Sequence, residues 1–334
     1  MPGPFDKLDP DEREKLVKKR QPSWIDPMLA TLTEKRFSSP DWIYERKLDG
    51  VRCLAFRKRD RVRLMSRNEN DISASYPELV EALATQERDA FIVDGEIVAF
   101  DGNLTSFSRL QGRLGISDSE RARRTGIGVF LYLFDVLWVD GCDTTKLSQR
   151  ARKEVLRRAL RFEDPVRFTQ HRNEHGRELL DEACKKGWEG LIAKRADAPY
   201  ASRRSRDWLK LKCVNGQELV IGGYTEGQGS RTGFGALLLG YYDGRELRYA
   251  GKVGTGFDDA LLAKLGRKLA TMETDKPPFG SEPRIKGAHW VRPTLVAEIG
   301  FTEWTGDGKL RHPRFIGLRT DKKAKDVRRE RPAA

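Results

Sequence analysis

One lysine has the surroundings of a candidate nucleophile. The stretch Glu45-Arg46-Lys47-Leu48-Asp49-Gly50 places Lys47 after an apolar-aromatic run at 42–44, with a carboxylate two residues away on either side. A free lysine has a pKa of about 10.4 and is protonated at neutral pH, so it attacks only when cations or a metal ion have lowered that pKa. Without partners elsewhere in the chain, Lys47 is an exposed strand lysine before a glycine turn.

Cations that could lower the pKa of Lys47 are available in Trp208-Leu209-Lys210-Leu211-Lys212. Alternation on a strand predicts that Lys210 and Lys212 share one face and that the apolar residues lie on the other. An ordinary amphipathic strand would show the same pattern.

Two glutamates and one phenylalanine could complete a site. Glu96 in Val93-Asp94-Gly95-Glu96 and Glu189 in Trp188-Glu189-Gly190-Leu191 adjoin apolar strand residues, where an unpaired charge is costly. Both would suit Mg²⁺, or Mn²⁺, which uses the same oxygen ligands. Phe134 could stack on a base. The alternatives are salt-bridged surface acids and ordinary core packing.

Taken together and in order, these segments resemble the covalent nucleotidyltransferases, a superfamily of ATP-dependent DNA ligases, RNA ligases and mRNA capping enzymes. The segments that carry this resemblance are 47–50 with Arg52, 66–68, 94–96, 134–135, 189–194 and 210–212. A finer resemblance, to the ligase module of bacterial end-joining ligases of the ligase D type, lies in 109–113, 222–226, 251–257, 311–314 and 319–322. It covers about residues 24–330 and leaves out the polymerase and phosphoesterase modules that often accompany this ligase, so a stand-alone ligase is expected.

The resemblance implies a reaction and a role for each matching residue. Lys47 would take AMP from ATP, pass it to a DNA 5′-phosphate and allow a 3′-hydroxyl to seal the break. The implied nucleotide contacts are Glu45, Arg52, Arg67, Glu96, Phe134, Arg206, Lys210 and Lys212. Glu96 and Glu189 would bind the metal ion, and Arg319, Asp321 and Lys322 would orient the leaving pyrophosphate.

Composition agrees with a polyanionic partner. The 334 residues carry a formal net charge of +13, spread along the chain, which favours nucleic acid over mere solubility. The implied partners are duplex DNA with nicks or breaks, a Ku-like end-binding protein and separate polymerase or nuclease modules. A monomer is expected, and the preferred DNA substrate stays open.

Cysteine and histidine spacing gives no metal or disulfide framework. The four cysteines are far apart and form no C-x-x-C pair, which predicts reduced thiols in a bacterial cytosol or nucleoid. His171 and His175 lie in a charged segment and are predicted to be surface residues. The longest apolar run, 129–139, is too short to span a bilayer, and the charged, proline-bearing N-terminus is no signal peptide.

The chain is expected to be an α+β protein of two domains. Residues 1–22 form a charged leader that adds little core, 23–215 an antiparallel-sheet nucleotidyltransferase (adenylation) domain, and 216–334 an OB-fold β-barrel with a basic tail, with a hinge near 214–217. The predicted elements of the first domain are a hairpin at 51–57 and 61–65, helices at 77–86 and 178–186, a strand pair at 91–100 around Asp94-Gly95, and strands at 129–139 and 190–193. Those of the second are strands at 219–224, 236–242, 247–252 and 296–304, a helix at 258–272, and a glycine-rich turn at 227–233.

Three other functions stay open. An RNA ligase or a GTP-dependent capping enzyme would share Lys47 and most of the pocket. A non-catalytic basic scaffold would coat DNA and carry no adenylate on Lys47.

Overall fold

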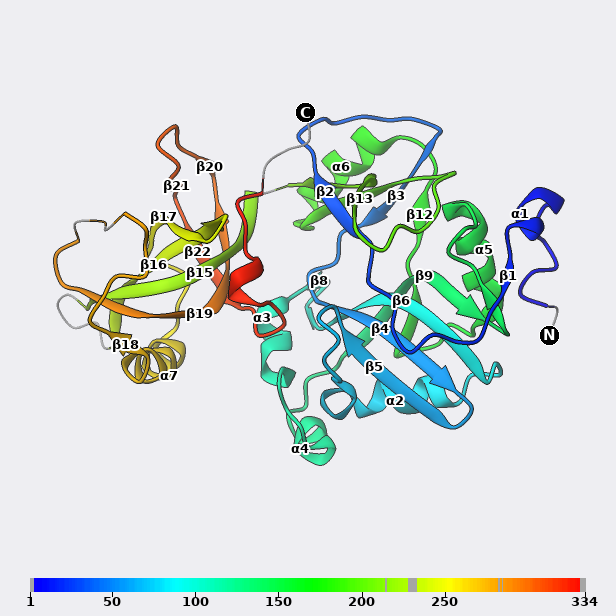
Figure 1. Ribbon diagram of the computed structural model, residues 1–334, viewed down its shortest axis with the longest axis horizontal. Coiled ribbons are helices and arrows are strands. Elements are labelled where there is room, and N and C mark those ends of the chain that lie inside the picture. The colour runs from blue at the N-terminus through cyan, green and yellow to red at the C-terminus, as the bar shows by residue number, and fades with distance from the viewer. Residues whose placement is uncertain (1–2, 214, 228–232, 282, 284, 331–334) are drawn as a thin grey trace. The chain divides into compact units, whose positions relative to one another are not determined.

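The computed structural model describes residues 3–213, 215–227, 233–281, 283 and 285–330 (Figure 1). The chain separates into two compact units, which meet in sequence at Cys213 and Val214. Unit 1 carries two large sheets and a two-stranded one, and unit 2 carries one large sheet, a two-stranded one and a helix. Within the described residues, no helix is long and apolar enough to cross a membrane.

The larger sheet of unit 1 has a buried core on each face. Its strand order is β1-β10-β9-β6-β4-β5, with β11 parallel to β9 and all other neighbours antiparallel. The strands are β1 (Val17–Lys18), β4 (Val51–Lys58), β5 (Arg61–Ser66), β6 (Ala90–Val98), β9 (Phe130–Val139), β10 (Cys142–Asp143) and β11 (Val166–Phe168). Val51, Cys53 and Ala55 point into the core covered by α2 (Pro77–Ala84) and α5 (Gln149–Ala159). Leu54 and Phe56 point to the other face, as period-two alternation requires.

The second sheet of unit 1 supplies most of the candidate site. Its order is β12-β3-β13-β14-β2, and the strands are β2 (Leu29–Leu32), β3 (Trp42–Arg46), β12 (His171–Arg172), β13 (Gly190–Arg195) and β14 (Arg204–Lys212). Helix α6 (Gly176–Lys185) covers one face, where Tyr44, Leu191 and Leu211 are buried against it. The polar residues of the same strands therefore gather on the opposite face.

The strand register confirms one part of the alternation prediction and corrects another. Lys210 pairs with Ile192 and Lys212 with Gly190, so both lysines lie on the face opposite Leu209 and Leu211. Trp208 does not join the leucines. It pairs with Lys194 two residues before Lys210 and therefore shares the lysine face.

The remaining elements of unit 1 are short. They are α1 (Pro10–Glu14), η1 (Ser73–Ser75), β7 (Phe100–Asp101), β8 (Leu104–Thr105), α3 (Phe107–Leu110), η2 (Gln111–Arg113) and α4 (Ser119–Arg124). The predicted hairpin, helices and strands at 51–65, 77–86, 129–139, 178–186 and 190–193 are confirmed within a few residues at their ends.

The predicted strand pair at 91–100 is wrong, because β6 runs through Asp94-Gly95 without a turn. The pairing of β6 with β9 shifts register at this dipeptide, so the strand accommodates Asp94-Gly95 by an irregularity in the ladder and not by a turn. A Cβ atom on Gly95 would lie 2.6 Å from the Tyr132 carbonyl oxygen, so the glycine allows close approach of the two strands.

Two further predictions fail in unit 1. The leader adds to the core, since Leu8 is buried in it and β1 pairs with β10. The thiols are not all reduced, because Cys184 and Cys213 form a disulfide with their Cα atoms 5.2 Å apart. Twenty-nine residues separate these cysteines in sequence, but α6 and the end of β14 bring them together. Cys53 and Cys142 are free.

Unit 2 is built on a twisted antiparallel sheet in the order β17-β16-β15-β19-β18, with β22 beside β19. Its elements are β15 (Asn215–Glu226), β16 (Phe234–Asp243), β17 (Glu246–Val253), α7 (Asp259–Ala270), β18 (Glu273–Thr274), β19 (Ala288–Phe301), β20 (Glu303–Trp304), β21 (Leu310–Arg311), β22 (Arg314–Leu318) and η3 (Ala324–Asp326). The four predicted strands and the helix are present. Sequence patterns missed β22 and the first half of β19, where Pro293 lies in the interruption of the β15–β19 pairing. Most of the glycine-rich turn predicted at 227–233 lies outside the described residues.

Candidate active site

Lys47 lies directly after β3, against the turn into β13. Its backbone N–H donates to the Gly190 carbonyl at 2.9 Å, and its Nζ lies 2.5 Å from Glu189 Oε2. A Cβ atom on Gly190 would lie 2.0 Å from the Leu211 carbonyl oxygen, so only glycine fits between the strands here. This close approach lets the side chain of Glu189 reach Lys47, 142 residues away in sequence.

The charges around Lys47 overturn the expectation that neighbouring cations lower its pKa. Burial lowers the pKa, but Glu189, Asp49 and Glu96 outweigh burial and raise the pKa well above its usual value. Lys47 is therefore protonated at neutral pH in the nucleotide-free chain. The same three carboxylates show that the structure brings Lys47, Glu96 and Glu189 together, as the sequence predicted.

Arg52 lies on the adjoining sheet and is held by a buried acid. Its guanidinium donates to both carboxylate oxygens of Asp94, and Asp94 also accepts a hydrogen bond from the Tyr200 hydroxyl at 2.6 Å. Tyr200 in turn accepts from the Met28 backbone N–H at 2.8 Å. In the β4–β6 register Arg52 pairs with Glu96, which places these two predicted residues side by side.

Phe134 is buried and bordered by cations. The Arg52 guanidinium carbon lies 4.6 Å from the centre of its ring, and Lys194 Nζ lies 4.3 Å from it. Trp208 contacts the same ring edge-on, with the ring centres 6.0 Å apart. The aromatic pair thus lies between β9 and β14 beside the candidate nucleotide contacts.

Glu45 is buried and bound by two lysines. Lys153 Nζ lies 2.7 Å from Oε1, and Lys194 Nζ lies 2.7 Å from Oε2. Burial alone would raise the pKa of Glu45, but the two ammonium groups outweigh it and hold the pKa below the usual value. Glu45 is therefore an anion that the surrounding side chains fix in place.

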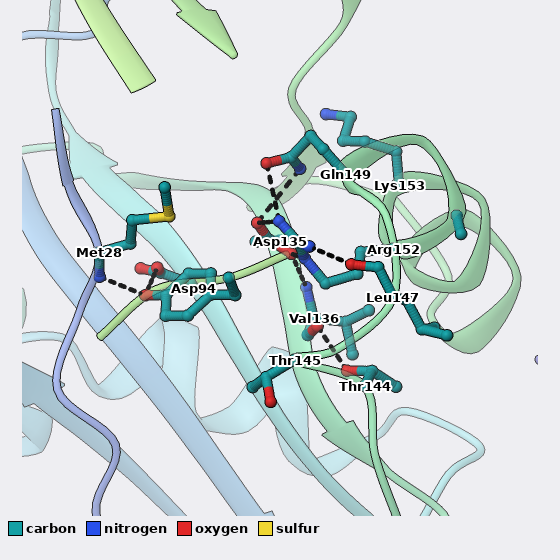
Figure 2. A network of polar contacts seen from close by, with 12 residues as sticks. Met28, Asp94, Asp135, Val136, Thr144, Thr145, Leu147, Gln149, Arg152 and Lys153 are labelled. Carbon is teal, nitrogen blue, oxygen red and sulfur yellow. Dashed lines mark hydrogen bonds and ion pairs between the residues drawn. The ribbon is translucent and has the colours of Figure 1, made fainter. Parts of the chain in front are cut away.

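Helix α5 supplies functional neighbours that the sequence reasoning missed. Arg152 is fully buried and makes an ion pair with Asp135, the residue after Phe134 (Figure 2). Gln149 donates to Asp135 at 3.2 Å and accepts from the Trp208 indole N–H at 3.0 Å. Gln149, Arg152 and Lys153 are spaced i, i+3 and i+4 on a helix with a buried face, and this spacing was the available signal.

The other predicted contacts of unit 1 are less enclosed. Arg67 follows β5 and is half-buried, as are Lys210 and Lys212 on the polar face of β14. Arg206 lies on the same strand and is exposed. Its register with β2 is interrupted between Ser205 and Leu209.

The predicted motif of unit 2 is an ion-pair cluster. Arg319 donates to both carboxylate oxygens of Asp321, at 2.9 and 2.8 Å, and Lys322 Nζ lies 3.0 Å from Glu218. Arg319 also lies 3.7 Å from Glu298. Burial would raise the pKa of Asp321, but Arg319 holds it below its usual value.

Two carboxylates are the metal ligands that this site offers. The described part of the chain holds no cluster of three or more histidine, cysteine or acidic side chains that could bind a metal ion. Glu96 and Glu189 nevertheless lie close enough to Lys47 for both to raise its pKa. A magnesium ion needs only one or two carboxylates when phosphate oxygens and waters complete its coordination shell. The donor set therefore fits a metal ion that binds together with a nucleotide phosphate.

His171 corrects the surface prediction, because it is half-buried and pairs with Glu45 across β12 and β3. Burial and the nearby Lys153 lower its pKa to about 4. Between about pH 4 and 6.5 the unfolded chain binds a proton here and the folded chain does not, so stability falls as the pH falls through this range. At pH 5 the free energy of unfolding is thereby lowered by about 2 kcal/mol.

We therefore expect His171→Gln to lose less stability than the parent chain between pH 7 and pH 5. Urea unfolding at both pH values measures the effect. The matched control is His175→Gln, because His175 is exposed at the start of α6. Equal pH-dependent losses in the parent and in His171→Gln would contradict the assignment.

Comparison with known proteins decides the family. The family of the ATP dependent DNA ligase domain matches residues 27–212, and that of the ATP dependent DNA ligase C terminal region matches residues 230–322. The chain belongs to the ATP-dependent DNA ligase family. The fold class is thereby confirmed as a nucleotidyltransferase unit followed by an OB-fold unit.

Several relatives of this ligase chain carry the name LigD. It is 41% identical over 323 residues to the multifunctional non-homologous end joining protein LigD of Pseudomonas aeruginosa, covering 93% of this chain and 37% of the relative. Identity to the LigD of Mycobacterium tuberculosis is 39% over 315 residues, covering 91% and 40%. The ligase chain spans about two fifths of the length of these relatives.

A solved structure of a mycobacterial DNA ligase D complexed with ATP and MES is similar to this ligase chain. The TM-score is 0.65 at 36% identity, and the match covers 92% of this chain and 98% of that one. ATP as the nucleotide of the family is thus supported by both sequence and structure.

Proposed function

We propose that this chain forms a covalent lysyl-AMP on Lys47 from ATP and uses it to seal 3′-hydroxyl/5′-phosphate breaks in duplex DNA. The observation that carries the proposal is the position of the Lys47 ammonium, 2.5 Å from Glu189, on the polar sheet face beside Glu96 and Arg52. A nucleophile, two metal-binding carboxylates and a phosphate-binding cation meet there.

In the first step the Nζ lone pair of Lys47 attacks the α-phosphorus of ATP. A nitrogen–phosphorus bond forms, the bond to the β-phosphate oxygen breaks, pyrophosphate leaves and the ammonium loses its protons to the surroundings. Lys47 must be neutral to attack, so the raised pKa of the nucleotide-free state has to fall before the reaction. The negative charge of ATP alone would raise this pKa further, whereas a metal ion held by Glu96 and Glu189 would offset their charge and lower it. Glu189 keeps the amine directed while this happens.

A bound magnesium or manganese ion, held by Glu96 and Glu189, would neutralise negative charge on the phosphate oxygens. Arg52 stays charged throughout, because Asp94 is fixed beside it and raises its pKa further. Lys210 and Lys212 lie on the same sheet face as Glu45 and supply further positive charge. These residues would stabilise charge that develops on the phosphate in the transition state.

The next two steps return Lys47 to its free form. A DNA 5′-phosphate oxygen attacks the adenylate phosphorus, the nitrogen–phosphorus bond breaks, and a DNA–adenylate anhydride forms. The 3′-hydroxyl oxygen then attacks the DNA 5′-phosphorus and AMP leaves. The net charge of +13 agrees with a DNA substrate.

Arg319 gives this scheme a step-specific prediction. If it orients pyrophosphate, Arg319→Ala should slow lysyl-AMP formation by about 10²-fold and leave the sealing of a nick that already carries AMP within about threefold of the parent rate. Single-turnover labelling and sealing assays measure the two steps. Arg267→Ala, an exposed cation on α7, is the control. Equal loss in both steps would contradict the assigned role.

We also propose that the chain acts in the repair of broken DNA ends, with a Ku-like end-binding protein and with polymerase or nuclease modules. The names of the LigD relatives support this setting. A nick-sealing assay extended to duplexes with ligatable ends, with and without a Ku-like protein, tests it.

The test of the proposed chemistry is incubation with α-labelled ATP or GTP and a divalent metal, followed by a denaturing gel and peptide mapping, with Lys47→Ala alongside. The proposal predicts label from ATP on Lys47. Label from GTP only would indicate a capping enzyme. Sealing of RNA but not of DNA would indicate an RNA ligase. No label in folded, nucleotide-free protein would favour the basic scaffold.

A further inference from the structure

The cluster of buried charged side chains around Glu45 holds one more cation than anion. Glu45, Lys153 and Lys194 are each no more than 2% exposed, and the two ammonium groups face one carboxylate. The nearby Asp135 is already paired with Arg152. A buried excess charge is costly unless another group neutralises or binds it, so the site favours an electron-rich ligand.

The two lysines are not equivalent. Lys153 uses two of its three N–H donors, because it donates to Glu45 Oε1 and to the Thr169 carbonyl, both at 2.7 Å. Lys194 Nζ lies near Glu45 Oε2, but within the described residues it makes no aligned hydrogen bond, although it is buried. Lys194 therefore retains N–H donors, and burial lowers its pKa to about 8.

Two neighbouring side chains also have unused polar atoms. Thr169 Oγ1 and His171 Nδ1 are buried and have no hydrogen-bond partner in the described part of the chain. Both belong to the segment beside Glu45, since Lys153 bonds the Thr169 carbonyl and His171 pairs with Glu45 in the sheet. Buried polar atoms are nearly always satisfied, so their clustering indicates a polar ligand.

The chemistry of that ligand follows from the groups that face it. Lys194 Nζ lies 4.3 Å from the ring centre of Phe134 and 4.1 Å from that of Trp208, so the donor borders aromatic surface. Glu45 can accept further hydrogen bonds, because each carboxylate oxygen has two lone-pair positions. An adenine ring presents an amino donor next to a ring-nitrogen acceptor, whereas guanine presents a carbonyl acceptor in place of the amino group.

We propose that Lys153 is a positioning residue for base recognition: it fixes Glu45 so that Glu45 accepts from the adenine amino group while Lys194 donates to a ring nitrogen. This inference rests on the proposed function for the identity of the nucleotide. Lys153 itself does not touch the base. Its removal leaves Glu45 paired only with Lys194, which draws the donor away from the ring nitrogen.

Equilibrium binding in a Lys47→Ala background tests the inference without any chemistry. The ligands are ATP, GTP and the triphosphate of unsubstituted purine riboside, which lacks the amino group. We expect Lys153→Met to weaken ATP binding at least about tenfold and to leave GTP binding within about twofold. Binding of the purine analogue should weaken by less than that of ATP, because the analogue keeps the ring nitrogen but lacks the amino group. Two ratios would therefore fall together: the affinity for ATP relative to GTP, and the affinity for ATP relative to the purine analogue that lacks the amino group.

The matched control is Arg157→Met. Arg157 lies one turn after Lys153 on α5, and both cations lie over the Phe168 ring, at 5.3 and 4.2 Å from its centre. Loss of charge or of packing on Phe168 would affect both variants alike, whereas loss of Glu45 positioning would affect only Lys153→Met. Lys153→Gln, which can still donate to the Thr169 carbonyl, is the second variant if Lys153→Met does not fold, and it should show the same loss of preference.

An unchanged ATP-over-GTP preference in a folded Lys153 variant would overturn the inference, as would an equal change in Arg157→Met. Labelling of Lys47 in the parent chain is measured separately. If Lys47 takes no label but the preference still depends on Lys153, the proposed function fails and base recognition stands. If Lys47 is labelled but the ATP-over-GTP preference does not change in the Lys153 variants, the proposed function stands and the inference about base recognition fails.

Discussion

Replacement of Lys47 by arginine should abolish ATP-dependent sealing, with a loss of at least about 10⁴-fold. Arginine keeps the positive charge and can keep the ion pair with Glu189, which lies 2.5 Å from Lys47 Nζ. It does not lose its proton at accessible pH, so it offers no lone pair for attack on ATP. The measurement is sealing of a nicked duplex together with labelling of the protein by α-labelled ATP.

The control for this variant is Lys58→Arg, a conservative change at the exposed end of β4. It should label and seal like the parent chain. Thermal unfolding of Lys47→Arg should match that of the parent, because the ion pair is retained. Appreciable lysyl-AMP formation in Lys47→Arg would show that another residue is the nucleophile.

Glu189→Gln is the second change with a large expected effect. The amide oxygen of glutamine can still accept a hydrogen bond from Lys47, but the negative charge is lost. Because Glu189 is the strongest of the carboxylates that raise the pKa of Lys47, the low-pH limb of the labelling rate should move to lower pH. The maximal rate should nevertheless fall by about 10²–10³-fold, since one of the two proposed metal-binding carboxylates is gone.

The measurement is the labelling rate as a function of pH and of magnesium concentration. A higher metal requirement in Glu189→Gln is expected alongside the slower rate. Glu182→Gln is the control, because Glu182 lies on α6 and makes ion pairs with Arg172 and Lys186 at the surface. A maximal rate equal to or above that of the parent would mean that Glu189 only lowers the reactivity of Lys47 by raising its pKa, and has no role in binding the metal ion.

The parts of the site that could be predicted from sequence are those that strand alternation determines. Lys210 and Lys212 lie on one sheet face because period two places them there, and the order of short motifs singled out Lys47, Glu96 and Glu189. That Glu45 shares the face of the two lysines follows from the strand register, which the sequence did not predict. The fold class followed from the same motifs and from the glycine-separated strands of unit 2.

The parts that could not be predicted depend on contacts between distant segments. The sign of the Lys47 pKa shift depends on Glu189, which β13 brings alongside β3. Lys153 acts on Glu45 from a helix 108 residues later, and no local pattern shows which element a buried helix face will meet. The Cys184–Cys213 disulfide likewise depends on the packing of α6 against β14.

In the proposed reaction, AMP on Lys47 is the intermediate that seals DNA. The most direct test is to label the protein with α-labelled ATP, remove all free nucleotide, and add a duplex with one 5′-phosphorylated nick and a divalent metal. We expect label to leave Lys47 and nicks to be sealed in proportion to the adenylate consumed, without added ATP. Label that stays on Lys47, or that leaves while the nicks stay open, would contradict it.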